Sequence, residues 1–425
     1  MVGQPAIYQA RRQALLSTVS SSSLILIDSA GTAPNPVLAD RNLCYLTGYR
    51  GRDAILLLAP GGIMVEHDET RGGPELARGR RVCEILFVRE QEAHQAFMDG
   101  HQATFEDIKA QSGVERVYPL SRLDAILSRA LMDAGELWIN VPGAPPLDRP
   151  LSPYLAYVER LRERFSWVQV RNIARQIHNL RFVKDAGEIA ALRQAFAAQS
   201  EIFEAIMRAL KPGENESLGQ AVLEYEVGRR GKRYRSMAAE AYEAGIVVAS
   251  GPNSLIPHYM ANSRDIQDGD LVLIDGCISY DGYYADITRT FPANGRFTPR
   301  QREIYSIVLE AQHAAFEVLR PGATILQAHR AIYDVFKRYG VEQYSYGNCG
   351  HSIGLTIHDP HGRFQDDREQ PLEPGVVLVI EPFLMMRDDG FGVRIEDGVV
   401  ITEHGHELLP GPVKEIDAVE ALCQR

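Results

Sequence analysis

Two pairs of acidic residues lie in strand–turn–strand patterns that bring carboxylates together. In LVLIDGCISYDGYYADITRTF (271–291), two strand-like runs flank an Asp-Gly dipeptide at 281–282, which is a strong signal for a two-residue hairpin turn. A hairpin centred there places Asp286 opposite Cys277, with Asp275 two residues along the same face. The backbones of the two aspartates are then about 7–8 Å apart, so both carboxylates can reach one cation.

A second hairpin pattern carries two glutamates. VVLVIEPFLMMRDDGFGVRIEDGVVIT (376–402) has its turn at 387–390, so Glu381 is expected directly opposite Glu396. Ionised carboxylates in that position repel each other, and a cation is expected between them. The alternative is that each of the four acids is a solvated residue beside a turn. That alternative is weakened for Asp275 and Glu381, which follow the apolar runs LVLI and VVLVI, because acids beside buried strands need partners.

Histidines supply a further type of metal ligand. The segment GHSIGLTIHDPH (350–361) carries His351, His358 and His361 between the two acidic hairpins. An imidazole among carboxylates suits a divalent ion such as manganese, iron, cobalt or zinc. A single histidine is more often structural, but the position of this Gly-flanked segment between the acidic hairpins favours a ligand.

The first part of the chain must fold as an α/β domain, because short apolar runs alternate with helical patterns. Strands bounded by Gly and Pro are expected over 23–30, 53–60, 62–69 and 136–143. A proline-rich loop at 141–153 precedes a helix expected over 154–165, and the domain boundary is expected near 173–185.

The second part begins with a long helix. Asp185 is a predicted N-cap, and Glu188 three residues later completes a capping box. The helix is expected to stop at Pro212-Gly213, and a second long helix stops in the same way at 321–322. The stretches LKPGENESLGQAVLEYEV and LRPGATILQAHRAIYDVF are weakly alike, which indicates a faint internal duplication rather than a repeat array.

Composition narrows the class of protein. A chain of 425 residues is long enough for two domains, and a net charge of −11 argues against nucleic acid or an anionic membrane as the main partner. Five widely spaced cysteines without a CxxC motif are typical of a reducing compartment. The sequence shows neither the apolar core of a signal peptide nor a run of about 18 apolar residues, so a cytoplasmic protein with no membrane partner is expected.

At this point the residues resemble a known family. Five of them match, in order and local context, the metal ligands of pita-bread metallopeptidases: Asp275, Asp286, His351, Glu381 and Glu396. The matching signatures are DGCISYDGYYADITRT, GHSIGLTIHD, IEP and GVRIED. The segment SGPNSLIPHY (250–259) is similar to the one that supplies a substrate-binding histidine, here His258, and His358 matches a second one.

The resemblance also covers the N-terminal half. YQARRQALL, NLCYLTGYRGRDAILLLAP and MDGHQATFEDIKAQSGVERVYPL look like the N-terminal domain of aminopeptidase P. The resemblance therefore implies a two-domain α/β protein. A creatinase-like N-terminal α/β domain is expected over 1–175, and a pita-bread catalytic domain, a duplicated α+β fold, over 176–425.

The combination of domains selects among branches of the family. Methionine aminopeptidases lack this N-terminal domain, and creatinase-like members lack the metal ligands. The resemblance thus implies the proline-directed branch, with an Xaa-Pro aminopeptidase expected and an Xaa-Pro dipeptidase (prolidase) as the main alternative. A non-catalytic pita-bread binding module and a creatinase-type amidinohydrolase are disfavoured, because both usually lose ligands that this chain keeps.

The resemblance further implies a ligand set for two divalent metal ions, with Mn²⁺ expected and Zn²⁺, Co²⁺ or Fe²⁺ as alternatives. Asp275 is expected to bind one ion, and Asp286 and Glu396 to bridge both. His351 and Glu381 are expected to complete the second site. Proline-containing peptides are the expected substrates, and a homo-oligomer, either a dimer or a tetramer, is the expected assembly.

Three further roles follow from the same resemblance. Glu381 is expected to carry a proton to the leaving nitrogen. His258 and His358 are expected to hold the scissile carbonyl and stabilise the charge that develops on its oxygen. Arg394, two residues before Glu396, is expected to orient the ligands, with a plain cross-strand ion pair as the alternative.

Two departures from the family pattern concern the substrate side. Members commonly carry another histidine four residues before the ligand histidine, where this chain has Gly347. The turn at 385–390 is also short, whereas aminopeptidase P often has a longer insert there. Both departures bear on which proline peptide is preferred, and neither changes the expected reaction.

Overall fold

The computed structural model describes residues 4–28, 41–51, 53–65, 80–91, 93–100, 103–141, 150–237, 245–345, 349–359 and 369–424. The chain divides into two compact units, Met1–Leu180 and Arg181–Arg425. Both units combine helices with sheets, so the predicted two-domain α/β architecture is confirmed. The domain ranges 1–175 and 176–425 stay a prediction.

A single mixed sheet forms the centre of the N-terminal unit, with strand order β4-β3-β2-β1-β5-β6. The strands are β1 (Ser23–Asp28), β2 (Ala54–Val65), β3 (Arg80–Val88), β4 (Arg116–Pro119), β5 (Glu136–Ile139) and β6 (Gln169–Asn172). The two strands predicted over 53–60 and 62–69 are one strand, β2, with a register irregularity between Leu58 and Ile63. The strand continues through Pro-Gly-Gly because β3 pairs with it on both sides of the irregularity.

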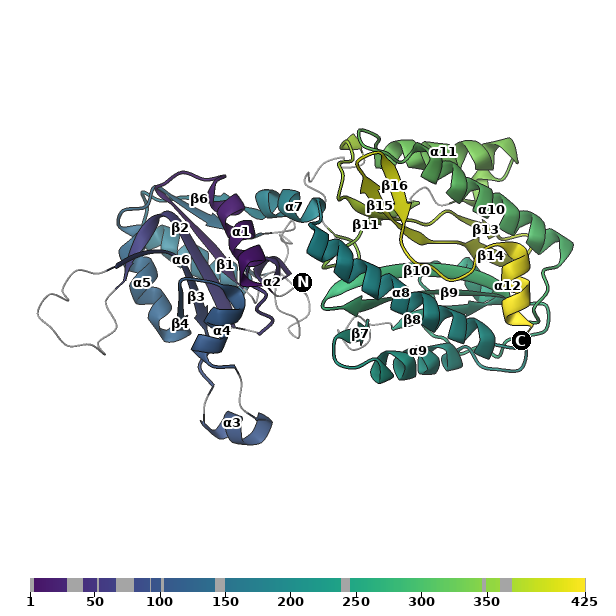
Figure 1. The fold of residues 1–425 in the computed structure, drawn as a ribbon, viewed down its shortest axis with the longest axis horizontal. Helices are drawn as coiled ribbons and strands as arrows, with labels where there is room; N and C mark the ends of the chain where they lie inside the picture. Colours follow the sequence, from purple (N-terminus) through teal and green to yellow (C-terminus); the bar gives the residue numbers. More distant parts are fainter. Residues whose placement is uncertain are drawn as a thin grey trace, which may run out of the picture. The chain divides into compact units, whose positions relative to one another are not determined.

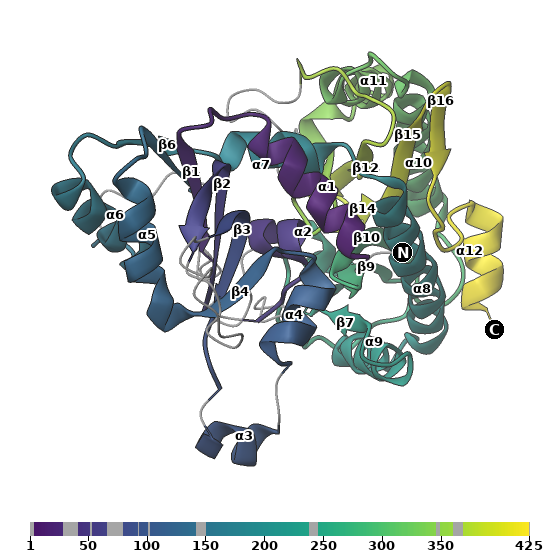
Figure 2. The same ribbon diagram turned by 60° about the vertical axis from the view of Figure 1, so that its left-hand side comes forward.

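Helices cover both faces of this sheet (Figures 1 and 2). The helices of this unit are α1 (Pro5–Leu16), α2 (Arg41–Thr47), α3 (Ala93–Asp99), α4 (Phe105–Ser112), α5 (Leu123–Leu131) and α6 (Pro153–Arg164), with a short 3₁₀ helix at Leu120–Arg122. Helix α3 lies away from the sheet in both views and covers neither face. One hydrophobic core joins the sheet to α5 and α6, and Leu127, Leu131 and Val158 are buried in it. The helix predicted over 154–165 is α6, and its N-cap Ser152 accepts a hydrogen bond from the Leu155 backbone N–H.

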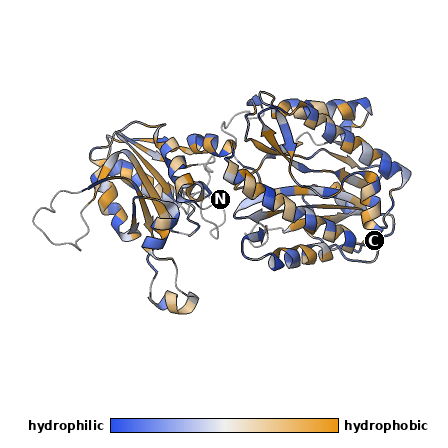
Figure 3. Cartoon of the chain, viewed as in Figure 1, coloured by the Kyte–Doolittle hydropathy of each residue, from blue (hydrophilic) through white to orange (hydrophobic). Residues whose placement is uncertain are grey.

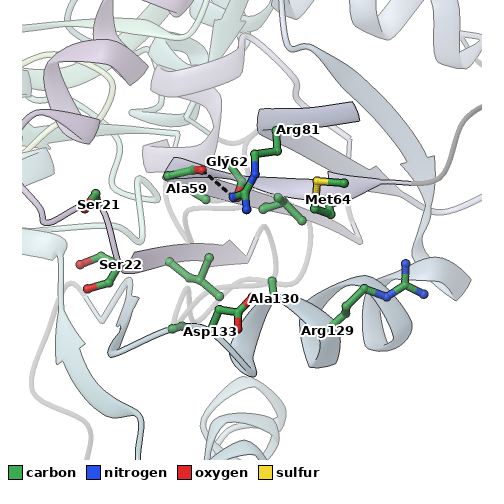
Figure 4. Close-up of a pocket in the computed structure, with 14 residues that line it drawn as sticks. Ser21, Ser22, Ala59, Gly62, Met64, Arg81, Arg129, Ala130 and Asp133 are labelled. Carbon is green, nitrogen blue, oxygen red and sulfur yellow. Dashed lines mark hydrogen bonds between the residues drawn. The ribbon is translucent and has the colours of Figure 1, made fainter. Parts of the chain in front are cut away.

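A cavity of about 570 Å³ opens between the start of β1, the far half of β2 and the end of α5 (Figure 4). Ser21, Ser22, Met64, Arg81 and Asp133 are among its lining residues. The Arg81 guanidinium donates a hydrogen bond of 3.0 Å to a glycine carbonyl of the β2 irregularity. None of the residues that line this cavity belongs to the predicted site, whose residues all lie in the C-terminal unit.

The C-terminal unit has two helix pairs that cover different strands (Figure 1). Helix α7 (Ala174–Phe182) contains the boundary between the two units along the chain. The helices after it are α8 (Ala186–Ala209), α9 (Ser217–Arg229), α10 (Pro299–Val318), α11 (Ile325–Arg338) and α12 (Ile416–Cys423). The predicted capping box of Asp185 and Glu188 is present at the start of α8. Each of the long helices α8 and α10 is followed by Pro-Gly and a second helix, which is the arrangement expected of an internal duplication.

Within the described residues of this unit, ten strands form the sheets. They are β7 (Tyr234–Ser236), β8 (Ile246–Ser250), β9 (Leu271–Tyr280), β10 (Tyr283–Pro292), β11 (Gly350–Ser352), β12 (Val377–Ile380), β13 (Phe383–Met386), β14 (Phe391–Arg394), β15 (Asp397–Thr402) and β16 (Gly405–Leu408). Strands β7 and β8 pair with β9, which pairs with β10, and a second sheet has the order β11-β12-β15-β16. Short 3₁₀ helices lie at Gly251–Leu255 and Glu342–Tyr344. Figure 3 shows largely apolar strands in both units.

Both acidic hairpins have the predicted register. Asp281 and Gly282 take positive φ values of 49° and 78°, as a type I′ turn requires, and Asp286 is the partner of Cys277. In the second hairpin, β13 pairs with β14, and the same register resumes where β12 pairs with β15. Glu381 and Glu396 lie opposite each other at the break between those two ladders. There the Glu381 backbone N–H donates to the Cys349 carbonyl and the Glu396 backbone N–H donates to the Thr288 carbonyl, both at 3.0 Å.

The cysteines and the hydropathy of the helices agree with the sequence analysis. All five cysteines are free thiols, as their odd number and wide spacing predicted. Within the described residues, no helix is both long enough and apolar enough to cross a membrane.

Candidate metal centre

Three predicted ligands from separate elements converge on one point. Asp286 lies on β10, His351 on β11 and Glu396 just before β15, and one ligand atom from each lies within 4.8 Å of the others. The His351 Nε2 atom is 3.7 Å from Asp286 Oδ2 and 4.0 Å from Glu396 Oε1. These distances leave room for a cation among the three side chains.

The other two predicted ligands border this cluster. Glu381 Oε1 is 3.9 Å from His351 Nε2. Asp275 is two residues from the partner of Asp286 in the β9–β10 ladder, and its Oδ2 accepts a hydrogen bond of 2.5 Å from Arg394 Nη2. The structure therefore brings all five predicted ligands to one region, with Asp286, His351 and Glu396 as its compact centre.

The carboxylates of this region repel one another, and burial together with this repulsion raises their pKa values. Burial, reinforced by the charge of Asp275, raises the pKa of Asp286 well above its usual range. Burial and the charge of Asp286 raise the pKa of Glu396 in the same way. Burial raises the pKa of Glu381 to about 7, with Asp275 adding to the rise and Arg394 opposing it. Mutual repulsion in a buried site is what a bound cation would relieve.

Glu396 shows most directly that the donor set fits a metal ion. Its Oε2 atom accepts a hydrogen bond of 2.9 Å from the Thr288 hydroxyl. Its Oε1 atom is buried, and no described residue donates a hydrogen bond to it. A buried carboxylate oxygen without a donor is costly, and a divalent cation supplies the missing partner. One imidazole with several carboxylates is a ligand set that divalent ions accept.

The raised pKa values predict an unusual pH dependence of stability in the chelated protein. Folded Glu381 keeps a proton between its ordinary pKa of 4.5 and its folded pKa of about 7, whereas the unfolded chain releases that proton. Because the folded state then binds more protons, stability falls as pH rises through this window. We expect the Tm of the chelated protein to be higher at about pH 5.5 than at about pH 7.5.

A Glu381→Gln variant is the control for this prediction. It removes one titrating carboxyl, so its Tm should depend less on pH over the same window. The pKa of His358, which burial lowers, acts in the opposite direction, and it does so equally in both proteins. A chelated wild-type protein with the same pH slope as the variant would contradict the assignment of Glu381 to this buried cluster.

Arg394 contacts both hairpins rather than one partner. In addition to its bond with Asp275, its Nε donates a hydrogen bond of 3.2 Å to the Thr288 hydroxyl, which in turn donates to Glu396. The Arg394 side chain is only 6% exposed. Thr288 was not singled out in the sequence, although its position two residues after Asp286 places it on the same strand face.

Gln312 on α10 is a second residue that the sequence did not reveal. Its side-chain amide donates hydrogen bonds of 3.1 Å to the carbonyls of Ile380 and Ile395, the residues that precede Glu381 and Glu396. One amide thus holds the backbone at both ends of the break in the ladder. No sequence signal marks it, because the groups that it binds are backbone carbonyls from other elements.

The predicted substrate-side histidines lie at the open side of the cluster. The His351 and His358 rings are 4.2 Å apart between centroids, at an interplanar angle of 49°. Burial and then the charge of His258 lower the pKa of His358, so the His258 ring lies near it. Both side chains keep contact with solvent, so the burial that lowers the pKa of His358 is partial. Gly347 and His361 lie outside the described residues.

A buried acid holds the segment that carries His258. Glu216 accepts hydrogen bonds from the Ser250 backbone N–H at 2.7 Å and from the Asn253 side chain at 3.0 Å. Its other oxygen accepts from the Arg264 backbone N–H at 2.9 Å. Glu216 therefore holds the start and the middle of the 3₁₀ helix Gly251–Leu255, and it holds the chain again after His258, at Arg264.

Comparison with known proteins identifies the family of this chain. Residues 190–403 match metallopeptidase family M24, and residues 8–138 match the N-terminal domain of aminopeptidase P. The chain belongs to metallopeptidase family M24. It is 30% identical to the Xaa-Pro aminopeptidase of Escherichia coli, over 98% of this chain and 97% of that protein.

Two further relatives of this M24 peptidase show how far each resemblance extends. The solved structure of proline aminopeptidase P II from Yersinia pestis is similar with a TM-score of 0.82 and 29% identity, covering 99% of both chains. An Xaa-Pro dipeptidase of Pyrococcus furiosus is 35% identical, but over 61% of this chain and 72% of that protein. The full-length similarity to aminopeptidase P confirms the predicted family, fold and enzyme class: the chain is a metallo-aminopeptidase.

Proposed function

We propose that this M24 peptidase is a two-metal enzyme that removes the N-terminal residue from peptides whose second residue is proline. The observation that carries the proposal is the convergence of Asp286, His351 and Glu396, with the Glu396 Oε1 atom buried and without a donor among the described residues. Full-length similarity to Xaa-Pro aminopeptidases supports the choice of substrate.

The five predicted ligands would hold two divalent ions, for which we propose Mn²⁺: Asp275, Asp286, His351, Glu381 and Glu396. Such ions, when bound, make water a nucleophile at neutral pH and polarise the carbonyl that is attacked. Carboxylate oxygens with one imidazole nitrogen suit Mn²⁺, while Zn²⁺, Co²⁺ and Fe²⁺ remain chemically acceptable. Arg394 and the Thr288 hydroxyl would keep Asp275 and Glu396 in place.

The remaining roles belong to side chains at the open edge of the centre. The Glu381 side chain is 21% exposed and that of Glu396 only 2%, so Glu381 is the better group to pass a proton to the departing nitrogen. His258 and His358 would donate hydrogen bonds to the scissile carbonyl oxygen and stabilise its developing negative charge. Proline suits a dedicated site, because its tertiary amide lacks an N–H and has a fixed φ.

Substrate length tests the proposal. We expect Xaa-Pro-Yaa tripeptides to be cleaved with higher kcat/KM than Xaa-Pro dipeptides at equal Mn²⁺ loading. A dipeptidase must bind the free carboxylate of proline, whereas an aminopeptidase needs space for the chain to continue. The turn between β13 and β14 is short, spanning only 387–390, which supports room for the chain to continue. Gly347 offers no side chain to hold a carboxylate.

An Xaa-Ala-Yaa tripeptide is the control for proline selectivity and should be a poor substrate. Steady-state release of the N-terminal residue measures all three peptides. A clear preference for the dipeptide would identify a prolidase, and equal cleavage of the alanine peptide would remove proline from the proposal.

We also propose a cytoplasmic location and a homo-oligomeric assembly, either a dimer or a tetramer. Five free cysteines support a reducing compartment. The assembly follows from the resemblance to aminopeptidase P, and light scattering of the purified protein measures it directly.

A further inference from the structure

His358 lies on a segment without regular secondary structure, so something else must hold its imidazole. The segment runs from the end of β11 at Ser352 to Asp359 and contains neither helix nor strand. Groups that act on a reacting atom need to be held within about 0.5 Å, and irregular segments do this only with added support. The nearest candidate for that support is the next residue, Asp359.

Asp359 is a buried carboxylate held by two cations. It is 2% exposed, and its Oδ1 atom is 2.5 Å from Arg181 Nη2. Its Oδ2 atom is 3.2 Å from Lys184 Nζ, and the Lys184 side chain is 1% exposed. Burial opposes ionisation, but the charges of Arg181 and Lys184 lower the pKa of Asp359 to about 2. The carboxylate therefore stays ionised and remains a fixed anchor across the working pH range of a peptidase.

The anchor is connected to His358 through the segment itself. The Thr356 backbone N–H donates to Asp359 Oδ1 at 3.2 Å. The Thr356 hydroxyl lies 3.0 Å from that oxygen and from the His358 carbonyl oxygen, so it donates to one of them at a time. The Asp359 backbone N–H donates a hydrogen bond of 2.9 Å to the carbonyl of Ser352, the last residue of β11, so the two ends of the segment are held together.

Two further contacts fix where this closed segment lies. The Tyr284 backbone N–H, on the strand that carries Asp286, donates to the Gly354 carbonyl at 2.8 Å. A Cβ atom at Gly354 would lie 2.7 Å from Asp359 Oδ2, so glycine is needed for the carboxylate to reach its place. Lys184 also donates to the Ser352 hydroxyl at 3.2 Å, next to His351. In the segment held by these contacts, the His358 ring packs against the His351 ring.

We propose that Asp359, anchored by Arg181 and Lys184, is a positioning residue that holds the His358 imidazole over the metal centre. The inference rests on the proposed role of His358 in the reaction. Asp359 itself contacts no predicted metal ligand among its hydrogen-bond and ion-pair partners in the described residues. It acts on turnover only through the histidine beside it.

A double-mutant cycle tests this inference: Asp359→Asn, His358→Ala and the double variant, with kcat measured on an Xaa-Pro-Yaa peptide. Because a displacement of about 1 Å can cost about 10²-fold, we expect Asp359→Asn to lower kcat by roughly 10–10²-fold. In the His358→Ala background the same change should cost less than about threefold, since the group that it positions is gone. Metal content, measured by mass spectrometry, should be the same in all four proteins.

A matched variant separates positioning from stability. Glu84→Gln removes one carboxylate of another buried ion pair, with Arg12, in the N-terminal unit. It should lower Tm in the same direction as Asp359→Asn while leaving kcat unchanged. If Asp359→Asn does not fold, Thr356→Val removes only the bridging hydroxyl, and its smaller kcat loss should likewise vanish in the His358→Ala background.

Equal kcat losses from Asp359→Asn in both backgrounds, or a wild-type kcat in the single variant, would overturn the inference. So would a loss of metal from Asp359→Asn. Failure of the proposed function has a different signature, because the wild-type protein would then not cleave Xaa-Pro-Yaa peptides at all.

Discussion

Glu396→Ala is expected to reduce turnover of Xaa-Pro-Yaa peptides by about 10³-fold or more and to lower metal content. Glu396 lies at the centre of the cluster, where Oε1 has no donor among the described residues and the side chain is 2% exposed. As a proposed bridging ligand it serves both ions. The bound ions stabilise the transition state by several kcal/mol. At about 1.4 kcal/mol per tenfold change in rate, losing that stabilisation corresponds to a decrease of about 10³-fold in turnover. Asp286→Ala should behave alike.

Chelation provides the complementary measurement. Exhaustive removal of divalent ions should abolish turnover, and added Mn²⁺ or Co²⁺ should restore it. The chelated protein should also melt at a lower temperature than the Mn²⁺-loaded protein at neutral pH, because the ions bind only the folded state. Glu407→Gln, which alters an exposed acid paired with Arg193, is the control and should keep both metal and activity. Full activity after exhaustive chelation would refute a metal-dependent reaction.

His358→Ala is expected to lower kcat by roughly 10²–10³-fold, the loss typical of one donor to a developing oxyanion. Its metal content should stay at the wild-type value, because the His358 ring packs against the His351 ring and is not one of the three clustered ligand side chains. His351→Ala should instead lose metal, since its Nε2 lies within 4.0 Å of three carboxylates. Steady-state kinetics and mass spectrometry of the two variants distinguish these outcomes.

His404→Ala is the control for the histidine variants. His404 is exposed at the turn between β15 and β16, away from the cluster residues in sequence and in sheet position. Its replacement should change neither kcat nor metal content. If His358→Ala lost metal while His351→Ala kept it, the ligand assignment would be wrong and the two histidines would exchange roles.

Local patterns alone predicted which acids of the two hairpins face each other. Asp-Gly at 281–282 selects a two-residue turn, and the two-residue period of a strand then places Asp275 and Asp286 on one face. The same reasoning placed Glu381 opposite Glu396, and the ladders on either side of that pair have the expected register. Turn chemistry and strand period act over a few residues, so they can be read from a single sequence.

Local sequence patterns gave the wrong strand boundaries where pairing with a further strand determined the structure. Pro-Gly-Gly at 60–62 predicted a turn between two strands, but β3 pairs with both halves and keeps them as one strand. Likewise, the sequence indicated that Glu381 and Glu396 oppose each other but not that the ladder breaks there. At that break the two backbones bond to Cys349 and Thr288 instead of to each other, and both carboxylates lie within 4.0 Å of His351 Nε2.

By itself, the sequence determined which residues are the candidate ligands, how they pair within each hairpin and which family they resemble. Only the tertiary structure decided what holds them in place. Gln312 acts on two backbone carbonyls, which have no side-chain signature in any sequence. Arg181 meets Asp359 from 178 residues away, a separation over which neither helical nor strand periodicity carries information. Such contacts form because buried polar groups must find partners once the core has closed, and which partners they find depends on the packing of the whole unit.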